Sequence, residues 1–328
     1  MKLNDLRKFK ECHFGNNVFI KSDKLSICKG AKVEDNVTIE AAKVHIGYNT
    51  IIEKNTIIKG IENPMQYFKL GDNTFIGFNN QILVPSFEML DYSQLHNGGL
   101  LSGYKALTIG YNCWIGQHSI LNSTDRLEIG NNVRIGTQSQ LWTHVASGEL
   151  IEGCTLFGSK PLVLKDNVWI IGGAIISPGL TLGRNSIIMT GSILTKSTEP
   201  FSTYAGIPAT NITNKLNFWK KMSLNNKFTL IKTFITEFIK ENPHYKNHIY
   251  IEKNINYAKP MNYKKNSIVI AKKIENIGRF LNQSFSVFDL QTKLYTKNRT
   301  NIEIDWIKFN VGFRARFIPY VNKAKSRV

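Results

Sequence analysis

Seven histidines are the side chains of this 328-residue chain best suited to proton transfer near neutral pH, because an imidazole titrates in that range. His144 follows Trp142 and Thr143 at the start of a stretch that lacks the regular pattern found around it, and Glu149 and Glu152 come a few residues later. An imidazole in such a place could take the proton from a hydroxyl nucleophile, and either carboxylate could orient it. The alternative is a solvated loop histidine beside two exposed carboxylates.

A second group of side chains has the composition of a binding site for a hydroxyl-rich acceptor. His118, Asn122 and Asp125 are close together in the sequence, and the indole of Trp142 could stack on a sugar ring. The alternative for His118 is an exposed position on a regular strand. No third histidine lies at metal-ligand spacing from His118 or His144, so we expect no metal site.

A six-residue repeat predicts the elements that position these residues. Its period fits neither an amphipathic helix nor an alternating strand. It is typical of a solenoid in which each short strand ends at a tight corner; a β-sandwich with regular turns is the alternative. In the clearest stretch, 164–196, the aliphatic positions are Leu164, Ile170, Ile176, Leu182, Ile188 and Leu194.

The repeat extends back to Ile27, and three hexapeptides would make one triangular coil. On this count we expect His118 to lie one coil away from His144. Two longer stretches interrupt it, residues 84–106 with His96 and residues 142–161 with His144. Each follows the third hexapeptide of a coil, so we expect both to leave the solenoid at the same corner as ordered loops.

The net charge of +18 is unevenly distributed. Residues 1–210 contain 19 Lys and Arg against 17 Asp and Glu, whereas residues 211–328 contain 23 against 7. We expect a solenoid domain over 1–212 and a small, basic α+β domain over 217–328. The basic domain would suit an anionic polysaccharide or the inner membrane surface as a partner, and we do not expect nucleic acid. A lysine-rich bias of solvated surface is the alternative.

Within the basic domain, hydrophobic periodicity predicts a few short elements. Residues 224–241 predict a helix with five apolar side chains on one face, Phe228, Ile231, Phe234, Ile235 and Phe238. The other expected elements are strands at 248–251, 267–271, 285–289 and 292–296 and a helix at 273–282.

Cysteine usage and the N-terminal segment indicate a cellular location. The four cysteines have no paired spacing, which favours reduced thiols in the cytoplasm. The N-terminal segment is too polar for a secretion signal, and no run of eighteen apolar residues exists. We expect a cytoplasmic protein, and a peripheral position at the inner membrane face is compatible with its charge.

An ordered set of motifs runs through the repeat region. Thr143-His144 opens the second long stretch and Lys160-Pro161 closes it; then come Asp166-Asn167-Val168-Trp169-Ile170, Ser177-Pro178-Gly179, Gly191-Ser192-Ile193-Leu194-Thr195-Lys196 and Ala205-Gly206-Ile207-Pro208-Ala209. Over residues 25–212 this order resembles the left-handed β-helix hexapeptide-repeat acyltransferases. The resemblance is to their galactoside and maltose acetyltransferase branch and to bacterial capsule and sialic-acid O-acetyltransferases.

The resemblance implies a left-handed parallel β-helix, a homotrimer with active sites between adjacent subunits, and acetyl-CoA as co-substrate. It makes His144 the general base and assigns the backbone amide of Gly172 to the oxyanion. Trp169 would shape the cleft beside the acceptor, or else only pack between coils. Thr190, Thr195 and Lys196 would line the CoA arm, and Pro208 and Ala209 the adenine pocket. One departure is Thr210, where the family often has a basic residue.

These features together predict an enzyme that transfers acetyl from acetyl-CoA to a sugar hydroxyl of a bacterial capsule or lipopolysaccharide. The alternative is an N-acetyltransferase of a nucleotide-linked amino sugar, since the same base would serve an amine.

Overall fold

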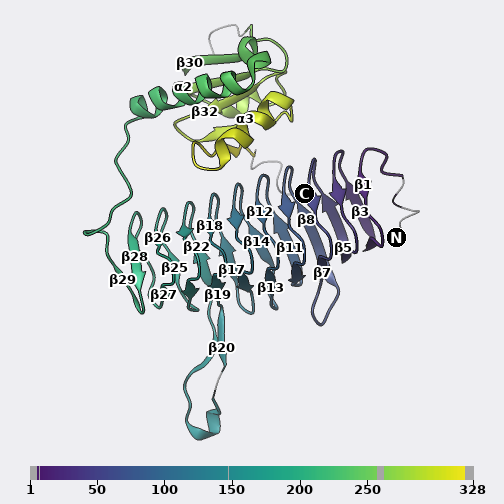
Figure 1. The fold of residues 1–328 in the computed structure, drawn as a ribbon, viewed down its shortest axis with the longest axis vertical. Coiled ribbons are helices and arrows are strands. Elements are labelled where there is room, and N and C mark those ends of the chain that lie inside the picture. Colours follow the sequence, from purple (N-terminus) through teal and green to yellow (C-terminus); the bar gives the residue numbers. More distant parts are fainter. Residues whose placement is uncertain (1–5, 7, 147, 257–261, 322–328) are drawn as a thin grey trace. The chain divides into compact units, whose positions relative to one another are not determined.

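The computed structural model describes residues 6, 8–146, 148–256 and 262–321. The chain forms two compact units, Met1–Trp219 and Lys220–Val328. Unit 1 is a parallel β-helix with three faces, here called A, B and C in the order in which the chain visits them (Figure 1). It is the three-faced parallel solenoid that the six-residue repeat predicts, and its axis is filled mainly by inward aliphatic side chains.

Each face is a ladder of short strands from successive coils. Face A contains β1 (His13–Phe14), β4 (Lys32–Val33), β6 (Ile51–Ile52), β9 (Phe75–Ile76), β12 (Gln94–Leu95), β15 (Trp114–Ile115), β18 (Arg134–Ile135), β23 (Trp169–Ile170), β26 (Ile187–Ile188), β28 (Thr203–Gly206) and β29 (Ala209–Asn211). Face B contains β2 (Phe19–Lys21), the first part of β5 (Thr38–Ile46), β7 (Ile57–Lys59), β10 (Gln81–Leu83), β13 (Leu100–Ser102), β16 (Ile120–Asn122), β19 (Gln140–Leu141), β24 (Ile175–Ile176) and β27 (Ile193–Leu194). Face C contains β3 (Lys24–Ile27), the second part of β5, β8 (Met65–Leu70), β11 (Ser86–Met89), β14 (Leu107–Ile109), β17 (Leu127–Ile129), β22 (Leu162–Leu164) and β25 (Thr181–Leu182).

Asparagines turn many of the corners, because Asn tolerates the left-handed backbone conformation better than other non-glycine residues. Asn17, Asn36 and Asn55 all have φ near +57°, at the corner between faces A and B. Their side-chain amides form a ladder with N···O distances of 3.1 Å. The sharp corners predicted from the turn residues therefore depend on one backbone conformation repeated coil after coil.

Of the two stretches expected to be loops, one leaves the solenoid and the other forms a regular coil. Residues 142–161 do leave the solenoid, between faces B and C, and the shorter excursion 60–64 leaves at the same corner, as predicted. Residues 84–106 are not a loop: they form a regular coil made of β11, β12 and β13. The prediction was wrong because Met89 occupies the inward position that the pattern required to be Ile, Leu or Val; its side chain is fully buried.

The second excursion is an antiparallel arm, visible in Figure 1 as the β20-containing hairpin that projects from the solenoid. It consists of β20 (His144–Ala146), the 3-10 turn η1 (Leu150–Glu152) and β21 (Phe157–Ser159). His144 pairs with Ser159 at its base. The tip is apolar and exposed, with Ile151 89% and Phe157 62% accessible.

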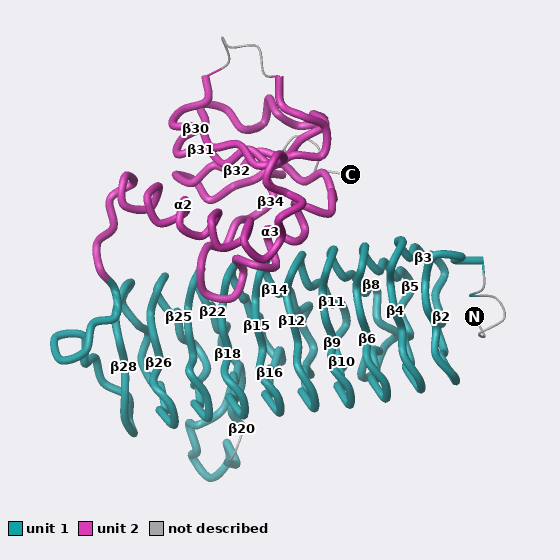
Figure 2. Tube along the Cα trace, turned by 45° about the horizontal axis from the view of Figure 1, so that its top comes forward, with its two compact units in different colours: residues 1–219 teal, residues 220–328 magenta. Residues whose placement is uncertain are grey.

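Unit 2, coloured separately in Figure 2, is a five-stranded mixed sheet with two helices. The expected helix is α2 (Leu224–Glu241), with Phe228, Ile231, Ile235 and Phe238 buried. The helix expected at 273–282 is wrong, because β31 continues to Ile274 and only a 3-10 turn follows. The remaining elements are η2 (Pro243–His248), β30 (Ile249–Ile255), β31 (Ile268–Ile274), η3 (Ile277–Phe280), β32 (Ser286–Asp289), β33 (Leu294–Tyr295), α3 (Asn301–Val311) and β34 (Ile318–Pro319).

In the described part of the chain, no helix has both the length and the apolar character that crossing a bilayer requires.

Candidate functional site

His144 lies at the root of the arm, where the chain leaves face B after β19. The root is closed by the N–H of Lys160, which donates to the carbonyl oxygen of Thr143 over 2.9 Å. The ring of Trp142 stands nearly edge-on to the imidazole, with 5.9 Å between centroids. The imidazole is half-buried, so it is positioned by the solenoid rather than by the arm's exposed tip.

The side chain of Asn122, one coil before, holds the imidazole. Its Oδ1 lies 2.9 Å from Nδ1 of His144 and also accepts from the backbone N–H of Thr143 and of Thr124, at 3.3 Å each. Its Nδ2 donates to the carbonyl oxygen of Ser102 (3.4 Å) and to Oγ1 of Thr124 (3.1 Å). These donors and acceptors fix which end of the amide faces His144, and the residue is buried.

This contact sets the tautomer of His144. An amide oxygen only accepts, so Nδ1 must carry the proton that it shares with Asn122, and in the neutral ring Nε2 is left as a proton acceptor. Of the expected orienting groups, neither Glu149 nor Glu152 forms this bond. Asn122, which the sequence placed only among acceptor-binding residues, has a positioning role that its local sequence did not indicate.

Thr143 completes the network and ties in Asp125. The hydroxyl of Thr143 is 2.7 Å from Oδ1 of Asn122 and accepts from the backbone N–H of Asp125 over 3.0 Å. Thr143 is fully buried. Hydrogen bonds from two consecutive coils thus hold the residues that flank the imidazole, which fixes the position of the candidate base.

The remaining predicted residues are divided between two corners of the solenoid. The corner between faces B and C holds Asn122, Asp125, Trp142 and His144, and further along it Thr195 and Lys196. The corner between faces A and B holds His118, Gly172 and Thr190. Trp169 projects from face A, and Pro208 and Ala209 lie at the β28–β29 turn that ends that face.

The register corrects the expected position of His118. Ile120 pairs with Gln140 and Leu121 with Leu141, so the residue one coil from Trp142 is Asn122, and His118 lies at the opposite edge of face B. There it adopts φ 55° and lies against Gly98, whose missing Cβ would be 2.5 Å from Nδ1 of His118. His118 and His144 of one chain therefore do not face a common site.

Gly172 has the backbone geometry of a donor site. Its φ of 147° is one that L side chains rarely adopt, and Gly173 follows with φ 59°. Gly172 accepts from the N–H of Gly191 at 3.0 Å, while its own N–H has no acceptor among the described residues. Gly172 is buried and the next residue, Gly173, is exposed. An unpaired backbone N–H held in a fixed position can stabilise a developing oxyanion.

The described residues contain no cluster of three or more His, Cys, Asp or Glu able to hold a metal ion.

Comparison with known proteins gives partial sequence matches. The chain is 36% identical over 107 residues to a putative acetyltransferase of Schizosaccharomyces pombe, covering 32% of this chain and 48% of the relative. It is 39% identical over 82 residues to the galactoside O-acetyltransferase of Escherichia coli, covering 24% and 40%. The chain resembles the hexapeptide-repeat acetyltransferases. It spans only about half of the length of these curated relatives, and no known protein-family profile matches it.

Among solved structures, a polysialic-acid-specific acetyltransferase, NeuO, aligns with 65% of this chain and 88% of its own, at 18% identity and a TM-score of 0.38. That score is low, and the resemblance to hexapeptide-repeat acetyltransferases rests on the sequence matches.

Proposed function

We propose that the protein transfers an acetyl group from acetyl-CoA to a hydroxyl of a sugar in a bacterial surface glycan. The observation that carries the proposal is the Asn122–His144 contact, which leaves Nε2 of the imidazole free to accept a proton. The relatives named as acetyltransferases support the donor and the reaction type.

In the proposed reaction, Nε2 of His144 removes the proton from the acceptor hydroxyl. The hydroxyl oxygen attacks the thioester carbon, and the negative charge that develops on the carbonyl oxygen is stabilised by the N–H of Gly172. When the carbon–sulfur bond breaks, the sulfur of CoA takes the proton from the imidazolium, which restores the neutral base. Thr190, Thr195, Lys196, Pro208 and Ala209 are the proposed CoA contacts.

The two corners imply that one chain does not make a complete site. Gly172 and His144 lie at opposite edges of face B, so a second copy must supply one of them. We therefore propose a homotrimer whose sites lie between adjacent subunits, and the exposed apolar arm tip is suited to contact a neighbouring copy.

The function is tested with the full chain, acetyl-CoA and a panel of free, nucleotide-linked and polymeric sugars, following CoA release. We expect transfer to a sugar hydroxyl; transfer only to a nucleotide-linked amine would favour the N-acetyltransferase alternative. His144→Ala should lower kcat about 10²- to 10⁴-fold. His13→Ala, at an exposed histidine of the first coil, is the matched control. Near wild-type turnover by His144→Ala would exclude the proposed base.

The shared site is tested by mixing two inactive variants. His144→Ala and Gly172→Ala subunits, co-expressed with different tags, should regain part of the activity in mixed oligomers, because some interfaces then combine an intact His144 with an intact Gly172. No recovery in a purified mixed oligomer would show that each subunit carries its own complete site.

We further propose that unit 2 holds an anionic polysaccharide or the inner face of the membrane, and that the protein acts in the cytoplasm. The support is the charge of residues 211–328, with 23 basic against 7 acidic side chains. Removing residues 217–328 should abolish salt-sensitive binding to an acidic polysaccharide or to anionic vesicles. Equal binding by the full and shortened chains would refute it.

A further inference from the structure

Three basic side chains of unit 2 lie together at one edge of its sheet. Strands β30, β31 and β32 are parallel to one another, and Lys293 lies in the turn between the carboxyl end of β32 and the antiparallel strand β33. Lys227, near the start of α2, and Arg316, just before β34, are close enough to lower the pKa of Lys293. Because ligands of open α/β sheets bind outside the carboxyl ends of the parallel strands, the cluster lies at the edge where a ligand is expected.

The backbone of Lys293 is fixed in a conformation that is unfavourable for lysine. Its N–H donates to the carbonyl oxygen of Asp289 over 2.8 Å, and its own carbonyl oxygen accepts from the N–H of Ile318 over 2.9 Å. Its φ of 63° lies in the left-handed region, which glycine and asparagine adopt at lower cost. What lysine supplies at this position is therefore its side chain rather than its backbone.

The ammonium group of Lys293 is held in place by an aromatic ring and has no acidic partner. It lies 4.2 Å from the centroid of the ring of Phe317, which is itself buried, and this is a cation–π contact. Among the residues that the structure describes, neither Lys227 nor Lys293 forms an ion pair. The carboxylate of Asp289, at the start of the same turn, accepts from the hydroxyl of Thr292 over 2.7 Å and from a backbone N–H of the turn over 3.0 Å.

Both charges that act on Lys293 are positive. Burial, together with Lys227 and Arg316, lowers the pKa of Lys293 to about 7, because like charges and desolvation disfavour the ammonium form. The Arg316 guanidinium donates from Nε to the carbonyl oxygen of Val311 over 2.9 Å and from Nη2 to that of Gly312 over 2.6 Å. It therefore adds positive charge from a fixed position, and we assign it no role as a ligand. An anion placed between the two lysines would offset this repulsion, and a dianion would do so more than a monoanion.

We propose that Lys227 and Lys293 bind a phosphate group, as a monoester or a diphosphate, at the carboxyl edge of the unit 2 sheet. Such a group carries close to two negative charges near pH 7 and presents oxygens in several directions, so two ammonium groups from different elements can each donate to it. Lysine binds phosphate as a point charge, whereas a carboxylate offers one charge and two oxygens in one plane.

The phosphate site concerns unit 2 alone and does not depend on the acetyl transfer proposed for unit 1. It narrows the anion binding proposed for unit 2, which follows from the overall charge of residues 211–328, to one defined place in the fold. A failure of the point variants described next would therefore leave the effect of the overall charge to be measured separately by removal of residues 217–328.

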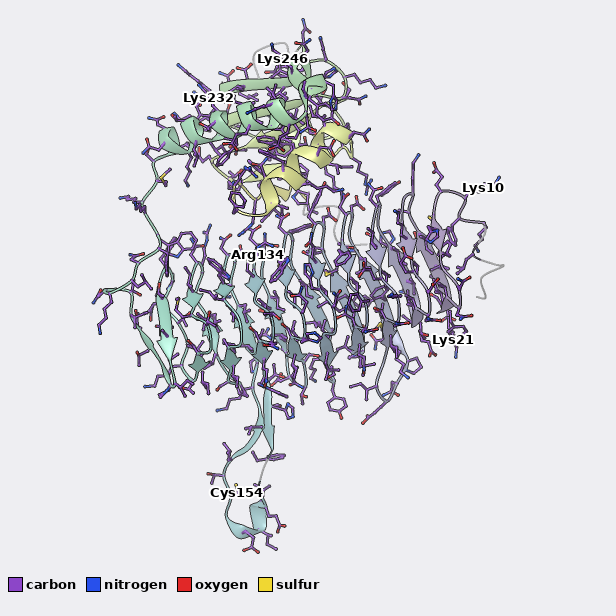
Figure 3. All side chains as sticks on the ribbon, in the orientation of Figure 1. Lys10, Lys21, Arg134, Cys154, Lys232 and Lys246 are labelled. Atoms are coloured by element: carbon purple, nitrogen blue, oxygen red, sulfur yellow. The ribbon has the colours of Figure 1, made fainter. Side chains whose placement is uncertain are left out.

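Binding is measured on the full chain by titration calorimetry with inorganic pyrophosphate at pH 6.5. We expect Lys293→Asn and Lys227→Gln each to weaken binding about ten- to a hundredfold, the usual worth of a hydrogen bond to a charged group. Asparagine tolerates the left-handed backbone at this position, so Lys293→Asn removes the ammonium group without straining the turn. The matched control is Lys246→Gln, because this exposed lysine, labelled in Figure 3, belongs to η2, which precedes β30 at the opposite edge of the sheet. No binding by the wild-type chain, or equal binding by all four proteins, would overturn the site.

The pH dependence of binding gives a second readout that a merely structural role of Lys293 would not produce. Sulfate is the probe, because it stays doubly charged between pH 6 and pH 9. Since Lys293 loses its proton in this range, the affinity of the wild-type chain for sulfate should fall by about tenfold as the pH rises. Lys293→Arg stays protonated and should show a smaller decline. Identical pH profiles of the two proteins would overturn the role of Lys293.

The source of the phosphate is identified by two further titrations, one with a nucleoside diphosphate and one with vesicles that contain phosphatidic acid. Weaker binding by Lys293→Asn in either titration supports the site and identifies a soluble or a lipid ligand. Polygalacturonate, an acidic polysaccharide without phosphate, is the comparison. If Lys293→Asn weakened the binding of polygalacturonate as much as that of pyrophosphate, the cluster would be a general anion-binding surface, and the phosphate site would be refuted.

Discussion

The contact between Asn122 and His144 gives the most specific prediction about catalysis. In Asn122→Ala, the imidazole loses the acceptor 2.9 Å from Nδ1, so nothing holds the tautomer that exposes Nε2 as a base. Two backbone N–H groups and the Thr143 hydroxyl also lose their shared acceptor. Leaving a buried polar group unpaired costs about 1–3 kcal/mol.

The size of the expected loss of kcat follows from the fact that Asn122→Ala still contains the proposed base. His144 is still present in Asn122→Ala, so the loss of kcat should be smaller than that of His144→Ala, on the order of tenfold to a hundredfold, if general-base catalysis contributes about 10²- to 10⁴-fold. Since several buried groups lose a partner, we also expect unit 1 to be destabilised by about 2–4 kcal/mol.

A second substitution separates orientation from stability. Asn122→Asp keeps the acceptor oxygen but adds a negative charge beside the ring; two unit charges about 4 Å apart interact by roughly 4 kcal/mol at an effective dielectric constant of 20. Desolvation of the carboxylate opposes part of this. The charged form of the base is then favoured, and the acid limb of the pH profile of kcat/KM should move up by about one to two units.

The assay is steady-state CoA release between pH 5 and pH 9 with the best acceptor from the panel, together with urea unfolding of each variant. Wild-type kcat in a correctly folded Asn122→Ala protein, or an unmoved acid limb in Asn122→Asp, would refute the assignment of Asn122 as the residue that positions the base.

Three further predictions concern other parts of the chain. Gly172→Ala should destabilise unit 1 by about 1–3 kcal/mol through its φ of 147°, whereas Gly173→Asn, at φ 59°, should be tolerated; equal melting temperatures would contradict this. Burial, with the nearby Lys227 and Arg316, lowers the pKa of Lys293 from 10.5 to about 7. Because the unfolded chain then binds one more proton between about pH 7 and pH 10, the free energy of unfolding of unit 2 should rise with pH over that window. Lys293→Met should remove this rise, which urea titrations at pH 7 and pH 9.5 would measure. Ile151→Ser in the exposed arm tip should weaken self-association about tenfold or more in sedimentation experiments, if burial of that side chain is worth about 1.5–3 kcal/mol; unchanged association would place the tip outside any subunit interface.

The solenoid was predictable because the period of its core residues is set by geometry. An inward side chain every six residues, followed by residues that tolerate a left-handed corner, leaves few other folds. The coil at 84–106 was missed because Met89 fills an aliphatic position, and methionine packs in cores as well as leucine does. A pattern that admitted Met would have found the coil through Leu95 and Leu101, which continue its six-residue spacing.

The candidate site was predictable in its central residue and not in its surroundings. The motif identified His144, but the sequence does not say which residue stands one coil away, since that depends on the strand register. Counting hexapeptides predicted His118 at the position one coil away from His144, whereas the strand register places Asn122 at that position.

In unit 2, the helix α3 was missed although Thr300 and Glu303 have capping-box spacing, and Thr300 accepts from the N–H of Glu303 at 3.4 Å. Its buried face includes the polar residues Glu303 and Asn310, so hydrophobic periodicity alone could not reveal it.

The repeated coils also determine how unit 1 can change in length. Because each coil of a solenoid contacts only its neighbours, a coil inserted or removed before β13 (Leu100–Ser102) changes the length of the solenoid by one strand spacing, about 4.8 Å, and leaves the contact between Asn122 and His144 in place. Duplication of a coil would therefore lengthen the outer faces of the solenoid without changing the residues around the proposed base.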